Sequence, residues 1–159
     1  IESKRTMNTE TQFLQVNIRP ASIDDLQKVV DLDAEITGLE KKEYWENHFN
    51  RFAERNGRYL MIAESKTPCE FLGFIVGEVS GWEFGSRPCG WVFVIGVAPS
   101  HRVQGIGEKL FNAMCEVLKA DGADSVRTMV GRDDQLNMSF FRSQGMMAGP
   151  FIELEKPLF

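Results

Sequence analysis

The chain has 159 residues, of which 43% are hydrophobic and 26% charged, a composition typical of one globular domain large enough to bury a core. A formal net charge of −5 disfavours a general nucleic-acid binder or a protein that binds anionic membranes. Three widely spaced cysteines and only two histidines disfavour a disulfide framework and a zinc site. We see neither an apolar run long enough to span a membrane nor a secretory signal, and therefore expect a cytoplasmic protein without a metal ion.

The first twelve residues are polar, and we expect them to be flexible and to precede a single domain at residues 13–159. Met7 is a plausible start, which makes residues 1–6 a candidate non-native remnant. Apolar residues at 13–18 then predict a first strand that ends by Pro20. Ser22 has the properties of a helix N-cap, and the pattern after it predicts a helix that stops near Gly38.

A second helix is predicted over residues 41–55, and it carries aromatic side chains on one side. We interpret this stripe as core packing. Four acidic residues lie in or near the segment, and a solvated face is the simplest interpretation of them, although they could attract a cation; they are Glu35, Glu40, Glu43 and Glu46. Strands are predicted next over residues 58–65 and 71–80, with a loop over residues 81–90.

The central stretch of the sequence is an apolar run followed by a glycine-containing loop and an amphipathic helix. Residues 91–98 predict a strand that is buried on both faces and ends before Pro99. Gly105 and Gly107 then stand where a helix begins, so an anion could approach the free backbone amides closely, and Arg102 adds positive charge. The loop therefore predicts a phosphate or pyrophosphate site, although a helix entry with convenient glycines would look the same.

The remaining elements complete an α/β pattern. Residues 125–130 predict a strand parallel to the central one, because a helix connects the two. A short helix is predicted over residues 134–143, and the alternating segment at residues 151–157 predicts a final strand.

The central stretch also resembles a known family. Val97, Pro99, Arg102, Gly105 and Gly107 match the pattern V-x-P-x-x-R/Q-x-x-G-x-G/A of the GNAT N-acetyltransferases in register. The resemblance implies an α/β, GNAT-like single domain with a mixed, mostly antiparallel sheet flanked by helices. The implied order is strand, two helices, three strands, helix, strand, helix and two strands. The implied activity is transfer of an acetyl group from acetyl-CoA to an amine of a small molecule or a protein.

In the family the loop binds the pyrophosphate of acetyl-CoA, and a bulge in the preceding strand pairs with the pantetheine arm. We expect that bulge at Gly96, because a glycine interrupts a β-branched run there. The cofactor-binding candidates implied in this stretch are Ile95, Gly96, Val97, Arg102, Val103, Gln104, Gly105, Ile106 and Gly107.

The segment DQLNMSFFRSQGM at residues 134–146 resembles the second GNAT motif, which adds Asn137 and Phe141 as cofactor-binding candidates. Phe141 stands where the family usually has a tyrosine, so the usual proton donor is missing. Trp91 stands where many relatives have a glutamate that acts as general base. Glu78, on the preceding strand, is the candidate substitute, and a solvated carboxylate is the alternative interpretation.

Two other functions remain open at this point. The missing acid and base favour a non-catalytic acyl-CoA-binding or regulatory domain, and the loop alone would also suit a phosphate ligand unrelated to CoA. The expected partners are acetyl-CoA and an amine acceptor, with neither nucleic acid nor membrane. A homodimer is a further open alternative.

Overall fold

The computed structural model describes residues 14–54 and 56–159. The chain divides into two compact units, the first reaching Arg127 and the second covering Thr128–Phe159. The first unit contains the sheet and the helices that pack on it, and the second contains one short helix and a long irregular tail.

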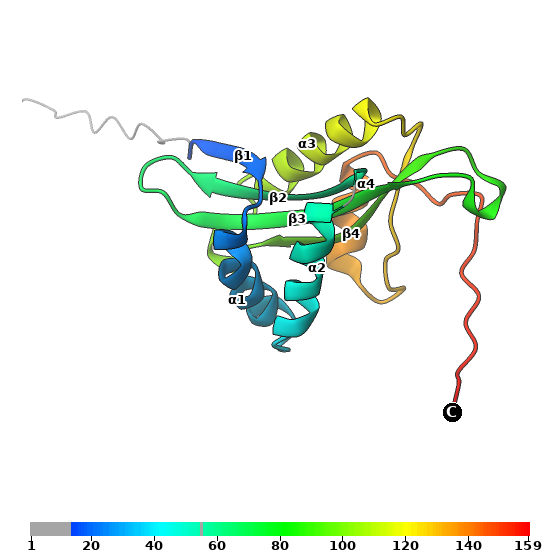
Figure 1. Cartoon of the computed structure of the whole chain (residues 1–159), viewed down its shortest axis with the longest axis horizontal. Helices are drawn as coiled ribbons and strands as arrows, with labels where there is room; N and C mark the ends of the chain where they lie inside the picture. Colours follow the sequence, from blue (N-terminus) through cyan, green and yellow to red (C-terminus); the bar gives the residue numbers. More distant parts are fainter. Residues whose placement is uncertain (1–13, 55) are drawn as a thin grey trace, which may run out of the picture. The chain divides into compact units, whose positions relative to one another are not determined.

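A five-stranded sheet forms the centre of the first unit (Figure 1). Its strands lie in the order in which they occur in the chain: β1 (Val16–Pro20), β2 (Arg58–Ser65), β3 (Phe71–Ser80), β4 (Cys89–Val97) and β5 (Val126–Arg127). The first four pair antiparallel, and β5 pairs parallel to β4. This arrangement confirms the mixed, mostly antiparallel sheet and the parallel placement of the strand after the helix.

The helices follow the predicted order. They are α1 (Leu26–Thr37), α2 (Lys42–Glu54), α3 (Ile106–Ala120) and, in the second unit, α4 (Gln135–Ser143). A short 3-10 turn, Ile23–Asp25, precedes α1, and Ser22 forms a capping box with Asp25. α1 ends at Gly38, whose φ of 74° is left-handed and thus favours glycine.

One face of the sheet packs against α1 and α2, and the opposite face packs against α3 (Figure 1). Trp45 of α2 and Phe74 of β3 lie in the first of these interfaces with ring centroids 5.2 Å apart, which confirms the core-packing interpretation for Trp45. The indole N–H of Trp45 donates to the buried Asp33 of α1 over 2.8 Å, so the two helices are joined by a polar contact within an apolar layer.

On the other face, three glycines let α3 approach the sheet closely. A Cβ added at Gly77 would lie 2.8 Å from the sulfur of Met114, and one added at Gly90 would lie 2.6 Å from a methyl carbon of Leu118. A Cβ added at Gly73 would likewise come close to a methyl carbon of Leu110. The three α3 side chains are spaced four residues apart, and each lies over one of the three glycines of the sheet. The helix therefore packs directly on the backbone of the sheet, where side chains would otherwise hold the two layers apart.

The bulge lies at a different position from the predicted one. Gly96 pairs in regular register with Phe74, whereas Val94 and Val92 pair with the consecutive residues Val76 and Gly77. Phe93 is therefore the extra residue. Packing against β3, and not the bulge, explains the glycine at position 96, because a Cβ there would lie 2.8 Å from the ring of Phe74.

The two ends of the sheet also differ from the prediction. β5 has two residues where residues 125–130 had been expected, and the final strand over residues 151–157 is absent from the described chain, as is any further strand beyond β5. The alternating pattern in residues 151–157 is present, but a strand also requires a neighbour for its backbone groups, and the described residues provide no ladder for this segment. β1 begins at Val16, and Phe13 lies outside the described residues.

Candidate functional site

The loop between β4 and α3 is the most distinctive polar feature of the first unit. The 3-10 turn Pro99–His101 follows β4, and α3 begins at Ile106. Pro99 ends the strand as predicted, and the amide of Ala98 still donates to the carbonyl oxygen of Leu72 over 2.8 Å. The start of the loop is therefore anchored to β3.

Beyond this anchor, a run of backbone amides has no internal acceptor. The first main-chain hydrogen bond of α3 is donated by Lys109 to Gly105 over 3.1 Å. Among the described residues, no acceptor receives a hydrogen bond from the amides of residues 103–108. Several consecutive donors at the positive end of a helix dipole favour a multiply charged anion.

Two residues of the loop have a left-handed backbone. Gly105 has φ of 77°, so a residue with a Cβ would be strained there although the space around the Cβ position is open. Val103 has φ of 66°, which is a strained conformation for a β-branched residue, and its side chain is fully exposed. Strain of this kind costs about 1–3 kcal/mol and is often found where a ligand is bound.

The loop carries cations although the whole chain is acidic, and the exposed carboxylate of Glu108 lies in the first turn of α3. Arg102 and Lys109 are exposed, and neither has an ion-pair partner among the described residues. His101 lies 3.7 Å from the carboxylate of Glu70 and also contacts the hydroxyl of Ser100. The free cations thus stand beside the free amides, as a phosphate site requires.

β4 leads to this loop and is only briefly paired on its outer side. The ladder between β4 and β5 covers Gly90 with Val126 and Trp91 with Arg127. From the bulge at Phe93 to Val97, β4 has a ladder only with β3 among the described residues. Phe93 is 53% exposed, and the sequence contained no signal that would have located it, because its neighbours are equally apolar.

Glu78 occupies a row of residues that crosses the sheet. It lies opposite Arg58 on β2 and opposite Trp91 on β4. Its carboxylate forms an ion pair with Arg58 at 2.9 Å, and both side chains are mostly buried. The proposed base therefore lies beside the start of β4 in register, but with a cationic partner that the sequence did not predict.

His48 of α2 is a further titratable group that sequence reasoning passed over. Burial and the charge of Arg51 hold the pKa of its imidazole below 6.5, and the charges of Arg58 and Glu78 also act on it. Its ring contacts Tyr44 with centroids 4.3 Å apart. His48 is therefore a neutral imidazole near neutral pH, close enough to the Arg58–Glu78 pair to sense its charges.

The remaining two candidates belong to the second unit. Asp134 caps α4, and both the backbone amide and the side-chain amide of Asn137 donate to its carboxylate, over 3.1 and 2.7 Å. Phe141 is buried and packs edge-on against Phe140. Their roles toward a cofactor remain predictions.

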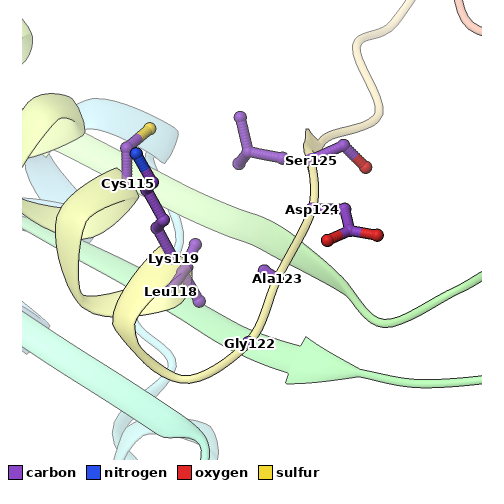
Figure 2. Close-up of a pocket in the computed structure, with 8 residues that line it drawn as sticks. Cys115, Leu118, Lys119, Gly122, Ala123, Asp124 and Ser125 are labelled. Atoms are coloured by element: carbon purple, nitrogen blue, oxygen red, sulfur yellow. The ribbon is translucent and has the colours of Figure 1, made fainter.

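A pocket lies at the C-terminal end of α3 (Figure 2). It has a volume of about 590 Å³ and is lined by Cys115, Leu118, Lys119 and residues 122–126. Burial raises the pKa of the Cys115 thiol, which keeps it protonated near neutral pH. A protonated, partly buried thiol suits a packing residue better than a nucleophile.

The described residues include no group of three side chains suited to a metal ion. None of the helices in the described part of the chain is long and apolar enough to cross a membrane.

The sequence matches the model of the Acetyltransferase (GNAT) family over residues 26–146, which is more than half of the chain. The chain belongs to the GNAT acetyltransferase family. This match confirms the resemblance drawn from the loop, and it extends from α1 through α4. No match was found among the curated protein sequences.

Solved structures share the same fold. An aminoglycoside N-acetyltransferase in complex with CoA has a TM-score of 0.78 at 14% identity, with 91% of this chain and 95% of that one covered. A transcriptional regulator from Bacillus halodurans C-125 has a TM-score of 0.77 at 18% identity, covering 91% and 100%. An aminoglycoside acetyltransferase from an uncultured soil metagenomic sample, in complex with sisomicin, has a TM-score of 0.70 at 19% identity, covering 91% and 97%. At these identities the likeness establishes the fold alone.

Proposed function

We propose that this GNAT protein transfers the acetyl group of acetyl-CoA to an amine of a small molecule or a protein. The observation that carries the proposal is the run of amides at residues 103–108 that have no acceptor within the described part of the chain, next to Arg102 and Lys109, which form no ion pair there. A pyrophosphate fits this arrangement because it offers several acceptor oxygens and negative charge to donors that are already oriented. The cytoplasmic location and a homodimer stay predictions.

The exposed edge of β4 supports the rest of the cofactor site. An extended pantetheine arm carries amide groups, which can pair with a strand that lacks a neighbour. Among the described residues, the segment from Phe93 to Val97 has a ladder on its β3 side only, and it ends at the loop between β4 and α3. We therefore expect the thioester near the bulge, where the backbone of Phe93 or Val94 supplies an N–H donor for the oxyanion.

The chemistry requires a neutral amine. Its nitrogen attacks the thioester carbon, the carbon–sulfur bond breaks, the CoA thiolate leaves, and the proton of the amine passes to a base. An ordinary alkylammonium has a pKa of about 10.4, so deprotonation near pH 7 costs about 4.6 kcal/mol. We propose that Glu78 accepts this proton, directly or through one water, and its register beside Trp91 supports this role.

A non-catalytic acyl-CoA-binding or regulatory domain is the second candidate. Two observations favour it: Phe141 has no hydroxyl to protonate the leaving thiolate, and Glu78 is engaged by Arg58. Release of free thiol from acetyl-CoA, measured with a panel of amines, separates the two functions, because a binding domain would take up acetyl-CoA without amine-dependent thiol release.

The cofactor loop is tested by replacing Gly105 with alanine. A Cβ strains the left-handed backbone at this position, and we expect the resulting shift of the loop to misalign at least one charge-assisted hydrogen bond to the pyrophosphate. The affinity for acetyl-CoA, measured by calorimetry, should fall about 10- to 100-fold, since such bonds contribute about 1.5–3 kcal/mol.

Gly122→Ala is a matched control. Gly122 follows the other end of α3, has φ of 94°, and also has open space at its Cβ position. Both variants should therefore lose similar stability from backbone strain. Equal acetyl-CoA affinity in the two variants would show that the loop does not hold the pyrophosphate.

A further inference from the structure

His48 is a half-buried, titratable residue of α2 that contacts three aromatic rings. The centroid of its imidazole lies 4.3 Å from that of Tyr44 and 5.7 Å from those of Trp45 and Phe52. The main chain of Tyr44 also forms a hydrogen bond with the imidazole. A neutral imidazole that donates one N–H to a main-chain carbonyl keeps its other nitrogen as a proton acceptor. The ring is therefore held in place with one nitrogen able to take up a proton.

Glu78 and His48 belong to the same face of the sheet. A Cβ at Gly77 would contact Met114 of α3, so the next residue of the strand, Glu78, faces away from α3. Val76, two residues before Glu78, belongs to the core cluster that contains residues of α1 and α2. The side chain of Glu78 therefore projects toward the layer formed by α1 and α2 (Figure 1), which is the layer that carries His48.

The two ends of α2 are both anchored to β3, which places His48 along the strand. Near the start of the helix, Trp45 contacts Phe74 with ring centroids 5.2 Å apart. Just beyond its C-terminal end, the main chain accepts a hydrogen bond from the amide of Val79 over 2.7 Å. His48 lies one turn after Trp45 and thus between the two anchors. Glu78 lies between the same anchors on β3.

The charges that act on the imidazole come from α2 itself, from β2 and from β3. Burial is the main cause of the lowered pKa of His48, and the cations Arg51 and Arg58 lower it further. The carboxylate of Glu78 acts in the opposite direction, because it stabilises an imidazolium. Since Arg58 and Glu78 form an ion pair at 2.9 Å, the imidazole lies within electrostatic reach of both partners.

The place expected for the thioester adjoins this group of residues. Val94, at the end of the bulge, pairs with Val76, and its side chain packs against the core cluster of α1 and α2. Glu78 lies two residues beyond Val76, which is about 7 Å along β3. A carboxylate side chain and one water molecule span such a distance. An amine that attacks there therefore gives up its proton on the face of the sheet to which both Glu78 and His48 belong.

We propose that His48 relays the proton of the acceptor amine from Glu78 to solvent. This inference rests on the proposed acetyl transfer and adds to it a residue that acts through Glu78. The ammonium gives one proton to the Glu78 carboxylate and becomes the attacking amine. The protonated carboxyl passes that proton through water to the neutral imidazole, and the imidazolium releases it to bulk water. The second proton, which the nitrogen loses as the amide forms, balances the CoA thiolate that leaves.

Proton NMR titration of His48 in the full chain tests the coupling to Glu78 without any substrate. Glu78→Gln removes a carboxylate charge and leaves Arg58 unpaired, and both changes disfavour the imidazolium, so the pKa of His48 should fall by about 0.4–1 unit. Glu64→Gln breaks an ion pair of the same length at the β1 edge and should leave that pKa unchanged. An unchanged pKa in Glu78→Gln would place the two side chains too far apart to exchange a proton and would overturn the inference.

Turnover measurements distinguish a relay from a structural role. With acetyl-CoA and an amine from the panel, His48→Gln should lower kcat about 5- to 50-fold and leave KM for acetyl-CoA unchanged; the loss is smaller than for a general base because water replaces part of the relay. Added imidazole should restore kcat in His48→Ala, which leaves space for it. The ratio of parent to His48→Gln kcat should fall toward 1 as the pH falls through the pKa of His48, below 6.5, because an imidazolium accepts no proton.

Asn50→Gln is the matched control, because Asn50 is an exposed residue of the same helix, and its kcat should equal that of the parent chain. Amine-dependent thiol release with normal kcat in His48→Gln would retain acetyl transfer and reject the relay. A loss of kcat that imidazole does not restore would assign His48 a structural role and also reject the relay. Absence of thiol release with every amine would instead reject the proposed function, and the relay with it.

Discussion

At the scale of single residues, Glu78 is the carboxylate on which the proposed proton transfer depends. Replacing it with glutamine keeps its shape and removes its basicity, so turnover should fall about 10²- to 10⁴-fold, the usual contribution of a general base. Affinity for acetyl-CoA should be retained, because the cofactor loop lies at the other end of β4. A pH–rate profile of the variant, recorded once an acceptor is known, measures the loss.

Glu64→Gln is the matched control for this prediction. Glu64 also lies on the sheet and forms an arginine ion pair of the same length, 2.9 Å to Arg19, but it belongs to β2 and faces the β1 edge. Both substitutions break one ion pair, and only Glu78→Gln should cause the large loss of turnover. Near-normal turnover for Glu78→Gln would leave solvent water as the proton acceptor.

At the scale of elements, the contact between α3 and the sheet is set by glycines. Gly77→Ala would place a Cβ 2.8 Å from the sulfur of Met114 and 2.9 Å from the carbonyl oxygen of Trp91. Because one of these atoms belongs to the backbone of β4, relaxation is limited, and we expect a loss of about 1–3 kcal/mol in the free energy of unfolding. Denaturant titration measures it.

Gly131→Ala provides the comparison for that variant, since the nearest atom to its Cβ position is 3.8 Å away, and its effect should stay within about 0.5 kcal/mol. Combining Gly77→Ala with Met114→Ala should cost less unfolding free energy than the sum of the two single substitutions, because removing the Met114 side chain relieves the clash with the new Cβ. A double-mutant cycle measures this difference as a coupling energy. Strict additivity of the two substitutions would contradict the close packing of α3 on Gly77.

At the scale of the whole molecule, stability should decline in two steps as the pH falls. Burial lowers the pKa of His48, so the unfolded chain binds more protons than the folded one, and stability should fall below about pH 6.5. Burial alone would raise the pKa of Asp25, but hydrogen bonds from Arg19 and Ser22 outweigh it and hold that pKa below its usual value. Its contribution is present above about pH 4 and is lost as the pH falls through the lower folded value.

Urea unfolding at a series of pH values tests both steps. His48→Gln should remove the first step, and Asp25→Asn should reduce the second while also weakening the bidentate contact to Arg19. A stability that stays constant between pH 7 and pH 5.5 in the parent chain would mean that His48 is free to protonate in the folded state.

The sequence by itself determined the features that are formed by residues close together in the chain. The helix and strand periods located the elements from β1 to α4, and Arg102, Gly105 and Gly107 located the loop, because all the groups of that site lie within a few residues of one another. The resemblance to the family motif added the order of the elements from β1 to α4, but the two strands that it implied after α4 are absent from the described residues.

Tertiary structure decided everything that depends on which strands become neighbours. The bulge lies at Phe93, and its position depends on how β4 pairs with β3, which the sequence of β4 alone does not specify. Gly96 is a glycine because the ring of Phe74 leaves no room for a Cβ, and it takes no part in the bulge. The pairing of Glu78 with Arg58 arises from residues twenty positions apart on β2 and β3. The alternating tail at residues 151–157 shows the converse: its pattern suits a strand, but a strand exists only where another one satisfies its backbone groups.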